Sequence, residues 1–232
     1  MRSASTVSGD ASRSEAVVHL SVPCTDDAWP ALTATLRDLT GDVRVLVVWV
    51  EAARDEAPDA ASSASPASAT ARADLLAVRQ RALAGLGRAD LLTVGVVADA
   101  TNGVGVAVAL GCDLRVFGAE ASLVVDAGTA GVLGRLAELV GYARALEMSV
   151  TGRRVSAQEA GAVGLANLVV TGDDVDAAVA DLVAAVLVTP REVGIEMKAA
   201  LTAAVEPGAR ERRVAAELAA AARLASDNGS DE

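Results

Sequence analysis

The chain has 232 residues, of which 52% are hydrophobic but only 2% aromatic, and its formal net charge is −11. This length suits an α/β domain with a helical extension, and the composition predicts a core of Ala, Val and Leu side chains. The acidic charge argues against nucleic acid as a partner, because phosphate binding requires a basic face. The sequence shows no secretory signal pattern and no apolar run of membrane-spanning length. We therefore expect a cytoplasmic protein with no membrane partner.

Three side chains that often carry chemistry are expected to be structural here. Cys24 and Cys112 lie far apart in the sequence and match no metal-ligand spacing or redox pair, so both should be buried and reduced. The only histidine, His19, falls in the alternating stretch VVHLSV, where a structural role is commoner than a catalytic one. We expect no metal site.

Hydrophobic periodicity predicts an α/β order of elements. Residues 1–15 and the tail 227–232 are polar and are expected to be disordered, and the Ala/Ser/Pro-rich stretch 52–71 predicts a flexible loop. The expected domains are a core over 16–170 and a helical oligomerisation region over 171–226. Strands are predicted at 17–22, 43–50, 93–98, 114–117, 122–126 and 168–170, and helices at 27–39, 72–87, 104–111, 133–140, 143–150, 156–164, 175–188, 190–205 and 209–225.

Polar residues mark several of these boundaries. Asp26 or Asp27 should cap the first helix, and Ser156 with Glu159 has the spacing of a reciprocal capping box. Asp113 and Arg115 open a strand after a helix, so we expect them to make surface or intersubunit contacts.

The central stretch, 96–128, has a glycine turn between a strand and a helix. Taken alone, the run of residues 101–105 (TNGVG) could be a phosphate-binding turn of a dinucleotide fold, although it lacks the third glycine of that fingerprint. A family resemblance gives a second interpretation.

The order of elements and three stretches, 109–123, 139–170 and 198–226, resemble the crotonase (enoyl-CoA hydratase/isomerase) superfamily. The middle stretch contains TGRRVSAQEAGAVGLAN, which is close to the family's TGRRISAEEALRIGLVN-like run. The resemblance implies an α/β fold with a crotonase-like ββα spiral core and a C-terminal helical region. It also implies acyl-CoA or CoA as the ligand or substrate, no separate cofactor, and a homo-oligomer, commonly a trimer or hexamer.

The family uses two backbone amides to bind a thioester oxyanion and one or two carboxylates to move protons. Matching its glycine run to this sequence gives Gly103, Val104 and Gly105, so the resemblance assigns oxyanion or substrate binding to these residues, with Val104 as amide donor. One catalytic glutamate position falls on Ala107. The other falls beside Asp126, which becomes the candidate catalytic acid or base. No residue of 52–71 matches the family's first amide motif.

Two functions follow from this resemblance. The favoured one is an accessory or catalytically reduced crotonase that forms a hetero-oligomer with another crotonase or pathway enzyme in an acyl-CoA or polyketide-type pathway. The alternative is an active acyl-CoA isomerase, hydratase or decarboxylase that uses the Val104 amide and Asp126.

Overall fold

A computed structural model of the protein describes residues 16–53, 69–126, 129, 131–171 and 174–205. The chain forms two compact units, Met1–Thr189 and Pro190–Glu232. Most of the expected flexible loop, the helix expected at 209–225 and both expected disordered ends lie outside the described residues.

The first unit is built on a five-stranded parallel sheet. Its strands follow the order β1-β2-β3-β5-β8, and every neighbouring pair is parallel. The predicted strands are confirmed with small shifts at their ends, and the continuous apolar run of β2 fits a strand that is covered on both faces. The strands are β1 (Val17–Val22), β2 (Val45–Val50), β3 (Leu92–Val97), β5 (Leu114–Gly118) and β8 (Leu168–Val170).

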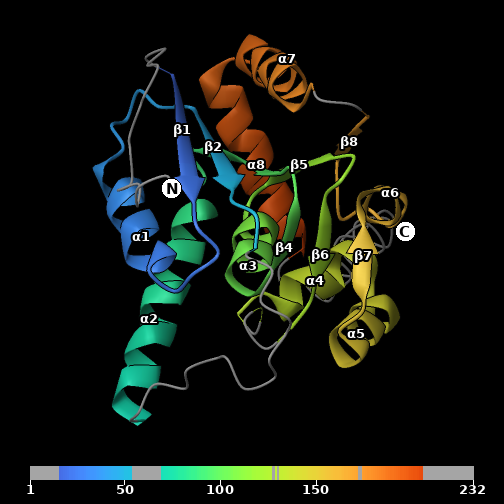
Figure 1. Ribbon diagram of the computed structural model, residues 1–232. Coiled ribbons are helices and arrows are strands. Elements are labelled where there is room, and N and C mark those ends of the chain that lie inside the picture. The colour runs from blue at the N-terminus through green and yellow to red at the C-terminus, as the bar shows by residue number, and fades with distance from the viewer. Residues whose placement is uncertain (1–15, 54–68, 127–128, 130, 172–173, 206–232) are drawn as a thin grey trace, which may run out of the picture. The chain divides into compact units, whose positions relative to one another are not determined.

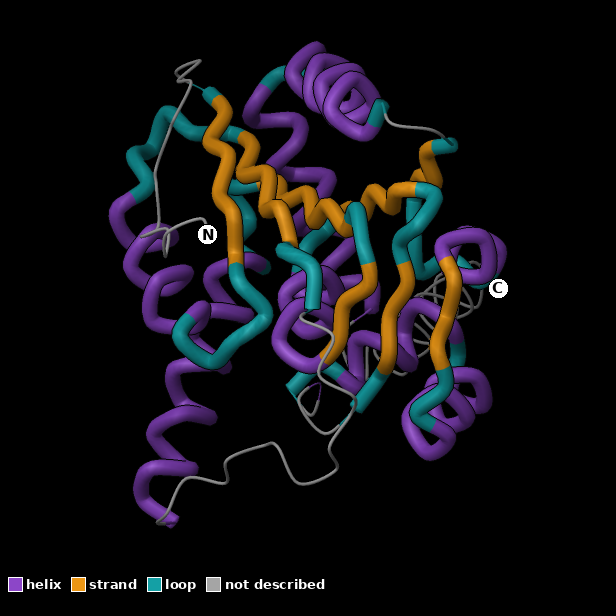
Figure 2. The backbone as a smooth tube through the Cα atoms, viewed as in Figure 1, coloured by secondary structure: helices purple, strands orange, loops and turns teal. Residues whose placement is uncertain are grey.

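A second, three-stranded sheet contains two strands that the sequence did not predict. Its order is β4 (Ala100–Asn102), β6 (Ser122–Val124) and β7 (Arg154–Ser156), and Figure 2 shows the three running side by side. The strands β3 and β5 each lead directly into a strand of this sheet, and then into helix α3 (Gly103–Gly111) or α4 (Leu133–Val140). This repeated strand-strand-helix unit is the ββα core that the resemblance implied.

The remaining helices lie close to their predicted bounds. Five belong to the first unit: α1 (Ala28–Asp38), α2 (Ala69–Leu86), α5 (Tyr142–Thr151), α6 (Ala157–Ala162) and α7 (Val175–Val188). The described part of the second unit is α8 (Arg191–Val205). None of the described helices is both long and apolar enough to cross a bilayer.

Alternate residues of β2 enter different hydrophobic clusters. Leu46 and Val48 face one cluster, together with α1 to α4, whereas Val45 and Val47 face a second cluster that includes residues of α7. The two sets of helices therefore lie on opposite faces of the large sheet (Figure 1). Because α7 packs on the sheet, it belongs to the first unit, which extends to Thr189.

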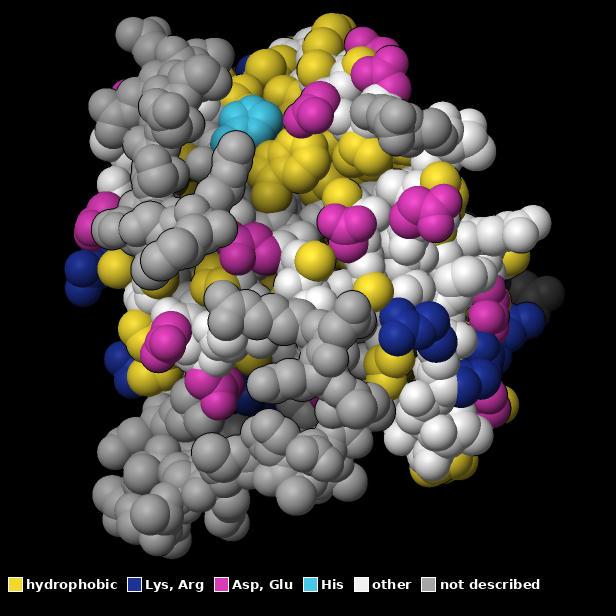
Figure 3. All heavy atoms as spheres, in the orientation of Figure 1, with side chains coloured by type: hydrophobic (Ala, Val, Ile, Leu, Met, Phe, Trp, Pro, Cys, Tyr) yellow, Lys and Arg dark blue, Asp and Glu magenta, His cyan; other side chains and the backbone are white. Residues whose placement is uncertain are grey.

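The two tryptophans lie in different surroundings. Trp29 of α1 is fully buried, and the Arg79 guanidinium lies 5.3 Å from its ring centroid, which is a cation–π geometry. Trp49 of β2 donates a 3.2 Å hydrogen bond from Nε1 to Nδ1 of His19. Figure 3 shows this histidine at the surface, beside a patch of hydrophobic side chains. The bond gives His19 a structural partner, in agreement with the expected role.

Arg115 is buried, contrary to the surface position expected from the sequence. Its side chain donates hydrogen bonds to the carbonyl oxygens of Leu165, Cys112 and Asp113, and the residue is only 2% exposed. Burial lowers the pKa of Arg115 to about 10, and the nearby charge of Arg135 acts in the same direction. The guanidinium thus stays charged at neutral pH and joins the start of β5 to the segment before β8.

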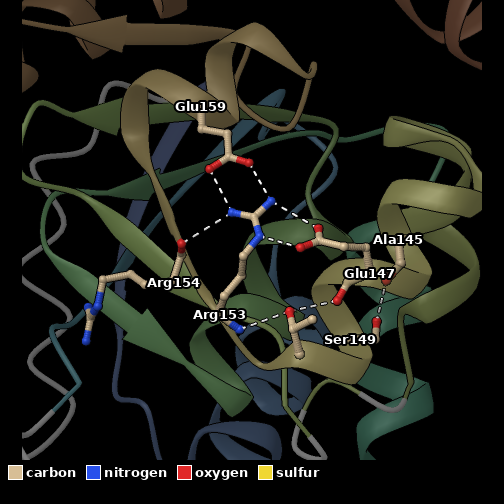
Figure 4. A network of polar contacts seen from close by, with 7 residues as sticks. Ala145, Glu147, Ser149, Arg153, Arg154 and Glu159 are labelled. Atoms are coloured by element: carbon tan, nitrogen blue, oxygen red, sulfur yellow. Dashed lines mark hydrogen bonds and ion pairs between the residues drawn. The ribbon is translucent and has the colours of Figure 1, made fainter.

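The TGRRVSAQEAGAVGLAN motif folds around Arg153. Figure 4 shows its guanidinium between two carboxylates, with Nη2 2.6 Å from Oε1 of Glu159 and Nε 2.6 Å from Oε1 of Glu147. Only half of the expected capping box forms: the Ser156 hydroxyl accepts from the Glu159 amide at 3.2 Å, while the Glu159 carboxylate binds Arg153. These contacts connect α5, β7 and α6, so the motif is accounted for by structure alone.

We expect the contribution of Arg153 to stability to depend on pH. Hydrogen bonding to Arg153 lowers the pKa of Glu159, so this stabilisation is present above the carboxyl's unfolded pKa and is lost as pH falls through the lower folded pKa. Urea unfolding should show a stability difference between wild type and Arg153→Ala at pH 7 that shrinks by pH 3. The side chain of the neighbouring Arg154 bonds the uncharged Ser122 hydroxyl, so the effect of Arg154→Ala should not follow pH in this way. Equal pH dependence in the two variants would contradict the prediction.

Candidate functional site

The three residues of the glycine run lie in the first turn of α3. Gly103 is the first helical residue, with a positive φ of 46°, which glycine adopts without the steric penalty of a side chain. Val104 and Gly105 follow, and both are buried. The first amides of a helix have no acceptor within it, and the N-cap residue, Asn102, makes no side-chain hydrogen bond to them. This turn therefore presents backbone N–H donors at the positive end of the α3 dipole.

Gly105 lies where no side chain fits. A Cβ atom there would be 2.0 Å from Thr101 Oγ1, 2.6 Å from Cys24 Sγ and 2.8 Å from Val50 Cγ1. The glycine is needed for close packing of α3 against the ends of β1, β2 and β4. Its φ is not in the positive region.

Gly105→Ala is expected to destabilise the protein by about 2 kcal/mol, because overpacking a filled core site costs about 1–3 kcal/mol. The matched control is Gly134→Ala in α4, where a Cβ would meet nothing within 4 Å. That exchange should stabilise by about 0.5–1 kcal/mol, since alanine is the better helix former. Urea unfolding of the two variants measures both values, and a neutral Gly105→Ala would contradict the packing argument.

Cys24 is a further member of this site, and the sequence did not identify it. Its thiol donates to the Glu51 carbonyl oxygen at 2.9 Å, and its sulfur lies 3.2 Å from Thr101 Oγ1. The pKa of this thiol is raised, mainly by burial, while the Thr101 hydroxyl and the amides of Gly105 and Asn102 act in the opposite direction. Cys24 is partly buried and Cys112 fully buried, and both are free thiols.

Asp126 lies just beyond β6, the strand that pairs with β4 in the small sheet. Asn102 of β4 pairs with Val124 of β6, so the chain continues from neighbouring positions to Val104 and to Asp126. Asp126 is exposed, and its backbone carbonyl accepts hydrogen bonds from the amide and hydroxyl of the buried Thr129, at 3.0 and 2.5 Å. The small sheet thus brings the segment of Val104 and the segment of Asp126 to the same end of the sheet.

Among the residues that the structure describes, no group of three or more His, Cys, Asp and Glu side chains could hold a metal ion.

Comparison with known proteins identifies the family. Residues 67–230, well over half of the chain, match the family model described as enoyl-CoA hydratase/isomerase. The chain belongs to this family. Its crotonase fold is shared with a protein of Thermobifida fusca YX assigned as an enoyl-CoA hydratase, which was crystallised with CoA. The likeness to that structure has a TM-score of 0.73 and 29% sequence identity, and it covers 93% of each chain. A T. fusca structure with acetoacetyl-CoA gives a TM-score of 0.71 and 26% identity, covering 93% of this chain and 94% of that one.

Sequence similarity to curated relatives is confined to a shorter segment. The Arabidopsis thaliana protein named "Probable enoyl-CoA hydratase 2, mitochondrial" is 36% identical over 89 residues, which are 35% of this chain and 29% of that protein. The enoyl-CoA isomerase/hydratase of Penicillium crustosum is 39% identical over 88 residues, which are 35% of this chain and 10% of that protein. The matches thus span less than a third of either relative. Membership in the crotonase family also supersedes the dinucleotide-binding interpretation of residues 101–105.

The position to which the resemblance assigns a catalytic glutamate lies inside the core. Ala107 is one helical turn after Gly103, and it is fully buried in the cluster that contains Leu110 and Phe117. The side chain of Val104 is also packed in this cluster and is 7% exposed. The interior of the α3 turn is therefore apolar where the family motif would place a carboxylate.

Proposed function

We propose that this crotonase-family protein binds an acyl-CoA thioester at the first turn of α3, with the Val104 N–H as the donor to the thioester oxygen. The Val104 amide receives no side-chain cap from the N-cap residue Asn102, and this supports the proposal because preorganised donors at a helix N-terminus stabilise a developing negative charge. The related T. fusca structures with CoA and acetoacetyl-CoA support this ligand class.

The protein is also proposed to be catalytically reduced. The observation that carries this part is the buried Ala107, which provides no carboxylate for proton transfer. Asp126 is the remaining candidate acid or base, and this residue is exposed whereas Ala107 is buried. A binding site that keeps its amide donor but has the buried Ala107 at the position assigned to a catalytic glutamate fits an accessory role in an acyl-CoA or polyketide-type pathway. The protein would act there in an oligomer with another crotonase or a pathway enzyme.

Calorimetry combined with turnover assays tests both parts. Acetoacetyl-CoA should bind more tightly than free CoA, because only the acyl ligand has a thioester oxygen that can accept from the Val104 amide. Crotonyl-CoA hydration and 3-enoyl-CoA isomerisation should not exceed the rate without protein. Turnover that is lost in Asp126→Ala would instead establish the active-enzyme alternative, and failure to bind either ligand would overturn the proposed binding site.

The accessory role has its own test. Native mass spectrometry of the protein purified together with the products of neighbouring pathway genes should show a hetero-oligomer. A homo-oligomer that turns over acyl-CoA by itself would contradict this part of the proposal.

A further inference from the structure

Four chain segments meet at the first turn of α3, and a short series of polar contacts joins them. The segments are the exit of β1 with Cys24, the end of β2 with Glu51, strand β4 with Thr101, and α3 with Gly105. Cys24 Sγ lies 2.9 Å from the Glu51 carbonyl oxygen and 3.2 Å from Thr101 Oγ1. We call these four residues the α3 junction.

The direction of the hydrogen bonds in the α3 junction follows from the number of protons. A thiol has one proton, and Cys24 donates it to the Glu51 carbonyl. The contact between Cys24 and Thr101 must then use the hydroxyl proton of Thr101. Thr101 is only 3% exposed, and a hydroxyl at that depth needs a partner. The result is a directed series from the Thr101 hydroxyl through the Cys24 thiol to the end of β2.

This series fixes the start of α3 against the large sheet. The backbone ladders hold β1 to β2 and β4 to β6, but the first turn of α3 has no side-chain cap of its own. Instead, the backbone of Gly105 lies directly on the Thr101 hydroxyl and the Cys24 sulfur, so closely that a Cβ atom on this glycine would overlap both. Val104, whose amide is the proposed donor, is the preceding residue.

We propose that Thr101 and Cys24 are positioning residues for the Val104 amide: their hydrogen bond holds the first turn of α3 at the place from which that amide meets an acyl oxygen. This inference rests on the proposed acyl-CoA site, and it adds two residues that act through the helix without touching the ligand. Hydrogen-bonding geometry at such sites is sensitive to small displacements of the donor.

The test compares affinities for two ligands. Acetoacetyl-CoA has an acyl oxygen for the Val104 amide and free CoA has none, so the ratio of their dissociation constants reports the position of that amide. Thr101→Val and Cys24→Ala should each weaken acetoacetyl-CoA binding by about three- to tenfold and leave CoA binding unchanged. Thr101→Ser keeps the hydroxyl and should restore the ratio. The double variant should lose no more than either single variant, because both remove the same contact.

Cys112→Ala provides the matched control. It removes a buried thiol at the other end of the same helix, where Cys112 is the C-cap and packs on β3 at Gly95. It should lower stability without changing the ratio of affinities. A ratio that stays at the wild-type value in Thr101→Val and Cys24→Ala would overturn the positioning role while leaving the acyl-CoA site intact. If wild type binds neither ligand, the site itself fails and the positioning role fails with it.

Discussion

Val104→Pro is expected to weaken acetoacetyl-CoA binding by about 10- to 100-fold, because a hydrogen bond to a charged or strongly polarised oxygen contributes about 1.5–3 kcal/mol. Proline has no N–H, so the exchange removes the proposed donor itself. Proline is tolerated in the first turn of a helix, where the missing N–H had no partner within the helix. Isothermal titration calorimetry with acetoacetyl-CoA and CoA measures the loss.

Val104→Ala is the control for this experiment. Both variants remove the buried valine side chain, but only alanine keeps the amide, so a comparison of the two isolates the N–H. Val104→Ala should retain acetoacetyl-CoA affinity within about threefold of wild type. Circular dichroism and thermal unfolding of both variants establish that each is folded. Equal affinities for acetoacetyl-CoA in folded Val104→Pro and Val104→Ala would exclude this amide as the donor.

Arg115→Ala is expected to destabilise the first unit by about 3 kcal/mol. The exchange leaves the carbonyl oxygens of Leu165 and Cys112 without this donor in a buried place, at about 1–3 kcal/mol for such a group, and it opens a cavity as well. Burial lowers the pKa of Arg115 only to about 10, so the arginine is charged throughout pH 5–8. The loss of unfolding free energy in Arg115→Ala should therefore be constant across that pH range. Urea unfolding at pH 5 and pH 8 gives both values.

Arg37→Ala is the corresponding surface exchange. Arg37 pairs with its neighbour Asp38, and 75% of its side chain is exposed, so its removal should change stability by less than about 0.5 kcal/mol. A loss in Arg115→Ala as small as in Arg37→Ala would show that the buried hydrogen bonds are replaced by water.

Most helices and the large-sheet strands could be predicted from the sequence because each has its own periodic pattern. The strands β4 (ATN) and β7 (RVS) could not, since neither lies in an apolar run such as those that marked the equally short β6 and β8. Both pair with β6. The surface position predicted for Arg115 was wrong for a related reason. A charged residue at the start of a strand is usually exposed, and only the tertiary fold brings the carbonyl group of Leu165, 50 residues away in the sequence, to the Arg115 side chain.

The candidate site was predictable in part. The family motif located Gly103, Val104 and Gly105 to within the first turn of α3, because the motif is a local sequence feature. Cys24 could not be found in this way. Its relation to Thr101 spans 77 residues, and nothing in its local sequence distinguishes it from an ordinary small core residue.

The placement of the two tryptophans allows folding to be followed by intrinsic fluorescence. Trp29 of α1 is fully buried and lies against Arg79 of α2. Trp49 is hydrogen-bonded to His19 on the large sheet. The two indoles should therefore differ in emission wavelength and in access to a soluble quencher. Replacing either one by phenylalanine leaves a single tryptophan. Stopped-flow fluorescence of the two variants would then show whether the α1–α2 layer and the sheet form together or in succession, without any attached dye.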